Sequence, residues 1–201
     1  MIKKRDAILF SLIVVSAIMI FTLLQKTDTF LQLIYRASGL FAYFFIFLAI
    51  LSSEYMRQMK NVFGKGFIAV HHILARIGIL LMLVHPVAFA IERRSISVFV
   101  PVFHPFTDFL ELAGRPAFYL ILIAVFAALY RKRISGGWKK IHYLIYPAFL
   151  LTFAHAWLIG TDLNSGSMQF LWIVMALTVA GIFLHKRVAL YRKSKHKKHI
   201  E

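Results

Sequence analysis

The chain has 201 residues, of which 60% are hydrophobic and 15% aromatic. A soluble domain usually holds about 45–50% apolar residues and could not bury this much apolar surface. The net charge of +16 comes from short basic clusters between apolar runs, a pattern typical of a polytopic membrane protein rather than of a nucleic-acid-binding protein. The chain has no cysteine, which excludes disulfides, iron–sulfur clusters and thiolate ligands, so any metal must be held by His, carboxylate or Met.

Six apolar runs predict six membrane-spanning helices, because a spanning backbone must satisfy its own hydrogen bonds and the alternation of a barrel strand is missing. The predicted fold class is therefore an all-α integral membrane protein, a six-helix bundle that forms one domain over residues 1–201 with a basic cytoplasmic tail at 186–201. The external segment 91–114 is amphipathic and is expected to lie along the outer membrane surface. In chain order, the predicted spans cover residues 7–24, 37–55, 67–91, 114–130, 141–160 and 168–185.

The lysines and arginines are distributed very unevenly between the two ends of these spans. Eighteen lie on the side that holds both termini and five on the other side, with Arg76 inside the third span. The positive-inside rule therefore predicts that both termini are cytoplasmic and that the protein crosses the cell or inner membrane several times. Trp138, Trp157 and Trp172 are expected to be aromatic anchors at the membrane interfaces.

Five of the nine histidines lie within two of the predicted spans. A polar or ionisable group within a bilayer is costly and is usually functional or paired. An isolated histidine is most simply a core residue bonded to a serine or a backbone carbonyl of a neighbouring helix. Two helices that each carry a histidine near the cytoplasmic end and another about four turns later indicate a shared site. The third span carries His71, His72 and His85, and the fifth carries His142 and His155.

The spacing of these histidines predicts two levels within the membrane. His71 and His85 are 14 residues apart, which places them on one face of a helix and about 21 Å apart along its axis. His142 and His155 are 13 residues apart, which gives a rise of about 19.5 Å and leaves them about 140° out of phase on an ideal helix. Pro147 lies between them and is expected to kink or rewind the helix. Because both spans run in the same direction, the inner histidines share one depth and the outer histidines another.

Two levels of facing imidazoles are the arrangement that two stacked bis-histidine haems require. Phase favours His71 over His72 as the inner ligand, because His72 is 13 residues from His85. A zinc or ferrous site fits poorly, since its ligands would have to lie within a few ångströms of one another. The remaining alternatives are a haem-free assembly subunit and an ion or proton transporter, although no acidic residue falls mid-span for a proton relay.

Three segments resemble the ferric-reductase-like transmembrane domain, a family that includes metalloreductases, NADPH oxidases and the haem-binding membrane subunit of the periplasmic methionine sulfoxide reductase system. WKKIHYLIYPAFLLTFAH, residues 138–155, resembles the W-x-x-L-H-x-L-x-Y signature that opens the family's fifth helix. GRPAFYLILIAVFAALYRKRISGG, residues 114–137, is similar to its fourth helix and basic loop. HHILARIGILLMLVH, residues 71–85, resembles its third helix. The resemblance covers about residues 35–185.

This resemblance implies which residues bind the cofactors, which would be two haem b groups. His71 and His142 would be the axial ligands of an inner haem iron, and His85 and His155 those of an outer one. Arg76 would pair with a haem propionate or with a helix-end carbonyl. In the sulfoxide reductase subunit an arginine pair takes the place of the two adjacent histidines of the third span, so the histidines here are closer to the two-haem oxidases and metalloreductases.

The implied function is that of a b-type cytochrome, the transmembrane electron-transfer component of an oxidoreductase, with no catalytic residue of its own. It would carry electrons from a separate cytoplasmic flavoprotein, which supplies FMN or FAD and oxidises NAD(P)H, to an external metal ion, dioxygen or partner reductase. The basic loop 131–140 would dock the flavoprotein, and His104 is a candidate for the acceptor site. The alternative within the family is a haem-binding subunit of a methionine sulfoxide reductase-type system.

Overall fold

The computed structural model describes residues 4–25, 27–63 and 67–198. All regular secondary structure in these ranges is helical, and no strand occurs in them. The elements are α1 (Lys4–Gln25), α2 (Phe30–Glu54), α3 (Met56–Phe63), α4 (Phe67–Arg93), η2 (Ile96–Phe99), α5 (Phe106–Glu111), α6 (Gly114–Leu129), α7 (Arg131–Ile134), η3 (Ser135–Gly137), α8 (Trp138–His142), α9 (Ile145–Ile159), η4 (Thr161–Asn164) and α10 (Gly166–Lys198).

The lengths and compositions of the helices indicate a protein that crosses the membrane several times. Within the described ranges, five segments are long and apolar enough to cross a bilayer: Arg5–Gln25, Phe30–Glu54, Ile68–Arg93, Trp138–Ile159 and Gly166–Val188. The fourth predicted span corresponds to α6, which has 16 residues and is therefore only about 24 Å long, shorter than the roughly 30 Å hydrocarbon core. The all-α fold class is thus confirmed, whereas a sixth span and the cytoplasmic position of both termini stay predictions.

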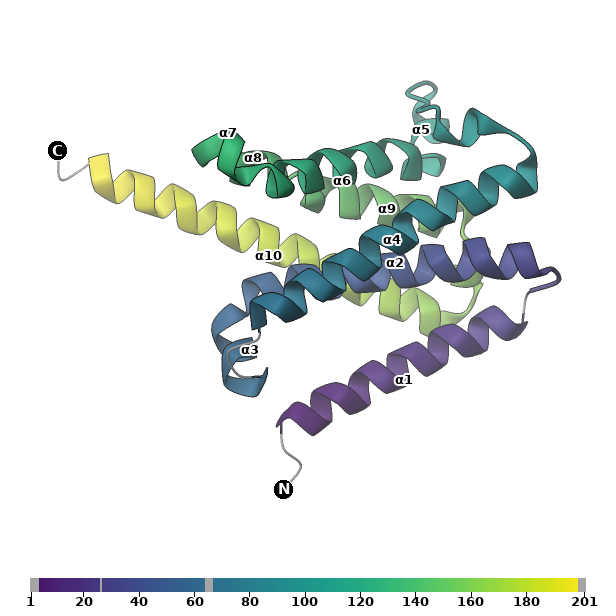
Figure 1. Cartoon of the computed structure of the whole chain (residues 1–201), viewed down its shortest axis with the longest axis horizontal. Coiled ribbons are helices and arrows are strands. Elements are labelled where there is room, and N and C mark those ends of the chain that lie inside the picture. The colour runs from purple at the N-terminus through teal and green to yellow at the C-terminus, as the bar shows by residue number, and fades with distance from the viewer. Residues whose placement is uncertain (1–3, 26, 64–66, 199–201) are drawn as a thin grey trace.

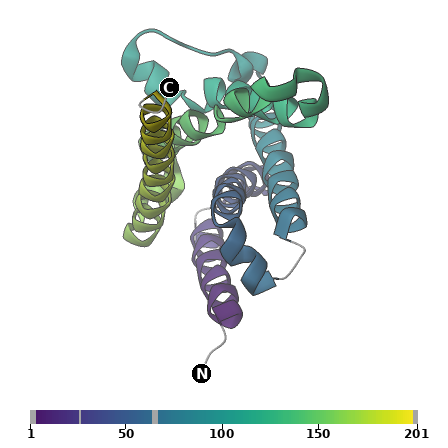
Figure 2. The ribbon, with the colours of Figure 1, turned by 90° about the vertical axis from the view of Figure 1, so that its left-hand side faces the viewer.

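The helices form two closely packed pairs and two further long helices. α2 packs along α4, and α6 packs on α9. In Figures 1 and 2, α2 and α4 lie side by side through the middle of the molecule, with α6 and α9 on one side of them and α1 on the opposite side. α10 contacts both α9 and α2 and so connects the two pairs.

The last helix is longer than the sequence predicts. The predicted sixth span ends at residue 185 and is followed by a separate basic tail, but α10 continues without a break to Lys198. Residues 182–198 contain neither glycine nor proline, and lysines and arginines near a helix C-terminus interact favourably with the helix dipole. The remaining tail residues, 199–201, lie outside the described part of the chain.

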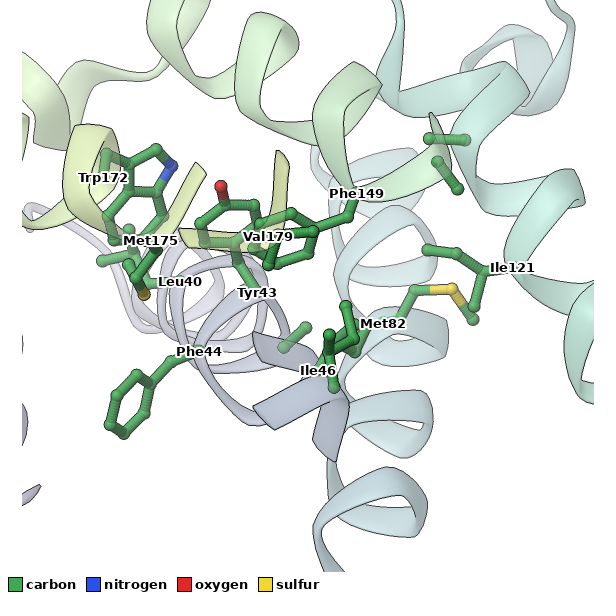
Figure 3. Packing of buried hydrophobic residues seen from close by; sticks show 14 of the residues in the cluster. Leu40, Tyr43, Phe44, Ile46, Met82, Ile121, Phe149, Trp172, Met175 and Val179 are labelled. Atoms are coloured by element: carbon green, nitrogen blue, oxygen red, sulfur yellow. The ribbon is translucent and has the colours of Figure 1, made fainter. Parts of the chain in front are cut away.

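A stack of three aromatic rings joins α2, α9 and α10 in the core. The ring of Tyr43 lies 4.1 Å from that of Phe149 and 4.7 Å from that of Trp172 between centroids, and Figure 3 shows the three side chains together. All three are buried. The prediction that Trp172 is an interfacial anchor is therefore wrong: it fills the space between helices, because the core needs a large side chain at this point of α10.

Two ion pairs join α2 to the chain around α10. Arg36, on the first turns of α2, pairs with Asp162 of η4, and both side chains are buried. Arg36 also donates to Thr27 Oγ1 at 3.0 Å. Near the other end of α2, Glu54 lies 2.6 Å from Lys186 Nζ of α10. α2 is thus tied at both ends, which fixes its position relative to the helices on either side.

Candidate functional site

The structure brings four of the predicted site histidines together as two pairs. His71 on α4 and His142 at the end of α8 lie close enough to interact electrostatically. His85, farther along α4, and His155 on α9 have the same relationship. Each pair therefore combines one side chain from α4 with one from the segment α8–α9, and the two pairs lie at different levels along these helices.

A break in the fifth predicted span positions its two histidines. α8 ends at His142 and α9 begins at Ile145, and the intervening turn is closed by backbone hydrogen bonds between residues three apart, at 3.0 and 3.2 Å. Pro147 has no N–H for the carbonyl of Tyr143, so the regular ladder cannot continue there. A turn with three residues per turn rotates each residue by about 120° rather than 100°, which moves His142 and His155 closer to a common phase. The predicted rewinding at Pro147 is confirmed.

All four imidazoles are held in the same way. In each ring Nδ1 lies within hydrogen-bond distance of a backbone carbonyl on a neighbouring helix. A carbonyl can only accept, so Nδ1 carries the proton and donates it, and Nε2 keeps its lone pair. Within the described ranges, none of the four Nε2 atoms has a hydrogen bond of its own. The acceptors are Ala49 at 2.9 Å for His71, Tyr35 at 2.7 Å for His85, Ala124 at 3.0 Å for His142 and Glu111 at 2.6 Å for His155.

Two glycines make room for the outer pair of rings. A Cβ atom on Gly39 of α2 would lie 2.7 Å from Nδ1 of His85, and one on Gly114 of α6 would lie 2.9 Å from the ring of His155. Such distances are shorter than ordinary van der Waals contact, so neither ring could stay in place beside a larger residue. Sequence reasoning missed both glycines, although Gly39 interrupts an apolar run and Gly114 opens α6.

The other predicted site residues lie apart from these pairs. His72 and Arg76 are on the exposed face of α4, and the ring of His72 is 5.8 Å from that of His71. Arg76 makes no hydrogen bond or ion pair with any residue that the structure describes. His104 is exposed in the external segment. Arg115 of α6 lies within electrostatic range of His155.

The residue types at the two levels limit the metal that could bind. The described ranges contain no group of three or more His, Cys, Asp or Glu side chains that could hold a metal ion. A haem iron needs only two protein ligands, because the porphyrin supplies the other four. Each histidine pair therefore has the number and type of side chains that one six-coordinate haem requires.

Comparisons with known proteins provide no relative for this chain. No protein-family model, curated protein or solved structure matches it. The likeness of residues 71–85 and 138–155 to the ferric-reductase-like domain therefore stays a prediction, and the function has to be argued from the histidine pairs themselves.

Proposed function

We propose that this protein binds two haem b groups within the membrane, one at His71 and His142 and one at His85 and His155, and carries electrons from one face to the other. One observation supports this above all: four imidazoles on segments long and apolar enough to span a membrane lie in two pairs, each ring donating from Nδ1 to a backbone carbonyl and, among the described residues, making no hydrogen bond at Nε2. Ligand histidines in metalloproteins are held in this way, since a hydrogen bond from the second ring nitrogen fixes the tautomer and makes the ligating nitrogen more basic.

The contacts of His71 and His72 favour the first as the inner ligand. His71 donates from Nδ1 to Ala49, also lies 3.3 Å from Ser52 Oγ, and is in electrostatic range of His142. His72 is exposed and has no hydrogen bond with the described residues. The imidazole of His71 is thus oriented before any cofactor binds, whereas that of His72 is not.

Haem, when bound, supplies reversible one-electron chemistry at its iron. The chain's contribution is to hold two imidazoles at each level, to separate the levels by about 20 Å of helix, and to exclude water with apolar side chains. Neutral imidazoles ligate without adding charge to the membrane interior, which suits a site on apolar membrane-spanning helices.

The donor and acceptor are part of the same proposal. The short helices α7 and α8 expose five basic side chains, Arg131, Lys132, Arg133, Lys139 and Lys140. Such a surface would attract an acidic flavoprotein that carries FMN or FAD and would raise its rate of association. The electrons would leave on the opposite face to a metal ion, dioxygen or a partner reductase, which includes a methionine sulfoxide reductase-type system.

A haem-free assembly subunit is the competing hypothesis. It is favoured by the same Nδ1 contacts, because a histidine that donates to a neighbouring backbone also pins two helices together. On this reading the free Nε2 atoms have no role, and replacing the rings would reduce stability without the loss of a cofactor.

Absorption spectroscopy of the purified protein distinguishes the two hypotheses. Expression with adequate haem supply should give the reduced-minus-oxidised spectrum of low-spin b haem, at about two haems per chain by pyridine haemochrome. A variant with all four histidines, His71, His85, His142 and His155, replaced by Leu, which cannot ligate iron, would serve as the control for nonspecifically bound haem. Wild-type protein that carries no more haem than this variant would contradict the proposal.

A further inference from the structure

Two polar side chains lie on the face of α4 that points away from its helix neighbours. His72 and Arg76 are four residues apart, so they are adjacent on the same side of the helix. The apolar residues around them, Ile73, Ile77 and Leu80, are exposed. On a helix long and apolar enough to span a bilayer, such an exposed apolar face is in contact with lipid. Arg76 therefore lies on a lipid-facing surface.

A guanidinium group is costly in hydrocarbon unless it finds a partner. Within the described chain, Arg76 has neither a hydrogen bond nor an ion pair. The partner of the guanidinium must therefore come from outside the described part of the chain, and the membrane surface is the nearest source. Arg76 also lies about 140° around α4 from His71, so its own helix directs it away from the inner histidine pair.

The side chains of His72 and Arg76 point toward the lipid headgroups near the N-terminus of α4. The Cα–Cβ bonds of a helix tilt toward its N-terminus, so the long side chain of Arg76 extends toward the start of α4. Arg76 is nine residues after Phe67, the first residue of the helix, which is a rise of about 13.5 Å. The aliphatic stem of an arginine can cover part of such a depth and bring the charged end to the level of the lipid headgroups. His72 is one turn nearer the same end.

We propose that His72 and Arg76 bind the phosphate of an anionic phospholipid in the leaflet next to the N-terminus of α4. The planar guanidinium offers two parallel N–H donors to phosphate oxygens, and the imidazole offers a further N–H. An anionic lipid is favoured over a zwitterionic one because its headgroup has no cation to compete with Arg76. This site is separate from the histidine pairs and does not depend on haem binding.

Native mass spectrometry of the detergent-purified protein tests this site. The protein is titrated with phosphatidylglycerol, with phosphatidylcholine of the same acyl chains, and with inorganic phosphate. Wild-type protein should bind a first molecule of phosphatidylglycerol more tightly than it binds phosphatidylcholine or inorganic phosphate. Arg76→Gln should weaken the binding of this first molecule about tenfold, the loss expected when one charge-assisted contact is removed. Arg76→Lys keeps the positive charge but not the two parallel N–H donors, so it should weaken phosphatidylglycerol binding less than Arg76→Gln does. His72→Gln should weaken this binding by an intermediate amount. The matched control is Arg93→Gln, an exposed arginine in the last turn of the same helix.

Each other outcome overturns the proposal in a distinguishable way. Equal phosphatidylglycerol binding by the wild type and Arg76→Gln would show that the site is not there. Phosphatidylcholine that is retained as tightly as phosphatidylglycerol would exclude an anionic lipid as the ligand. Inorganic phosphate that binds the protein as tightly as phosphatidylglycerol would exclude it as well. Loss of haem from Arg76→Gln with unchanged lipid binding would assign Arg76 to a propionate, and loss of a copurifying protein would assign this face of α4 to a protein partner.

Discussion

Gly39 on α2 faces the imidazole of His85 on α4 so closely that a Cβ atom on Gly39 would lie 2.7 Å from Nδ1. His85 donates from this nitrogen to the carbonyl of Tyr35, one turn earlier on α2, at 2.7 Å. The absence of a side chain at Gly39 and the hydrogen bond at Tyr35 therefore fix one orientation of the ring. Gly114 on α6 lies against the other edge of the His155 ring, where a Cβ atom would be 2.9 Å from Cδ2 and 3.0 Å from Nε2, so both outer imidazoles rest against a glycine.

Replacing Gly39 with Ala should displace His85 and remove the outer haem. The added methyl group cannot fit beside Nδ1, so the ring has to turn and its bond to Tyr35 is lost. Haem content should fall from about two to about one per chain by pyridine haemochrome, as expected for the loss of one axial ligand.

Two other glycines provide controls for this substitution. A Cβ on Gly78 would crowd Ile46 at 3.0 Å and no histidine, and one on Gly181 would meet nothing within 4 Å. Gly181→Ala should stabilise the protein by about 0.4–1 kcal/mol, because alanine has less conformational freedom in the unfolded chain. Full haem content in Gly39→Ala would contradict the assigned role of this glycine.

Pro147→Ala should disturb the phase between His142 and His155. An alanine can donate to the carbonyl of Tyr143, so the tight turn between α8 and α9 can relax toward a regular helix. The two histidines would then rotate away from a common face, and haem content should fall by up to one per chain. Pro101→Ala, in the external segment, is the control. Unchanged spectra for Pro147→Ala would mean that the break does not depend on the proline.

Asp162→Asn should be among the most destabilising polar substitutions in the chain. Arg36 would keep its charge in a buried position without its carboxylate, a change that typically costs about 3–5 kcal/mol. Glu54→Gln, at the more exposed pair with Lys186, should cost less because solvent screens that pair. The shift in melting temperature on thermal unfolding in detergent measures the destabilisation of both variants. A smaller shift for Asp162→Asn than for Glu54→Gln would contradict the ranking.

Tyr43→Phe should raise stability, in contrast to most substitutions of core residues. The hydroxyl of Tyr43 and the Nε1 of Trp172 are buried and have no hydrogen-bond partner among the described residues. Removing an unsatisfied hydroxyl recovers a desolvation penalty of about 1–3 kcal/mol, while the phenylalanine ring keeps the stack on Phe149. Tyr43→Leu, which loses the stack as well, should destabilise. A lower melting temperature for Tyr43→Phe would indicate that the hydroxyl has a partner, such as a buried water.

The spacing of the histidines could be predicted from the sequence because it depends only on helix geometry and on one proline. The 14-residue interval on α4 and the effect of Pro147 both follow from properties of a single helix. The partners of the rings could not be predicted in this way. Tyr35 and Glu111 accept with backbone carbonyls, which every residue has, so their side chains give no signal.

The features whose positions the sequence did not predict depend mostly on contacts between helices. Trp172 was expected at an interface because tryptophan is common there, but its neighbours on α2 and α9 bury it. The exposed position of Arg76 depends on which face of α4 packs against α2, and hydropathy alone does not determine that face. The extension of α10 beyond residue 185 follows from helix propensity, which a search for apolar runs does not consider.

Haem stoichiometry of five single histidine variants tests the central claim most directly. Wild-type protein should contain about two haems per chain by pyridine haemochrome. Replacement of His71, His85, His142 or His155 by Ala should each leave about one, and His72→Ala should leave two. Haem-free wild-type protein, or full haem content in the four ligand variants, would contradict the account.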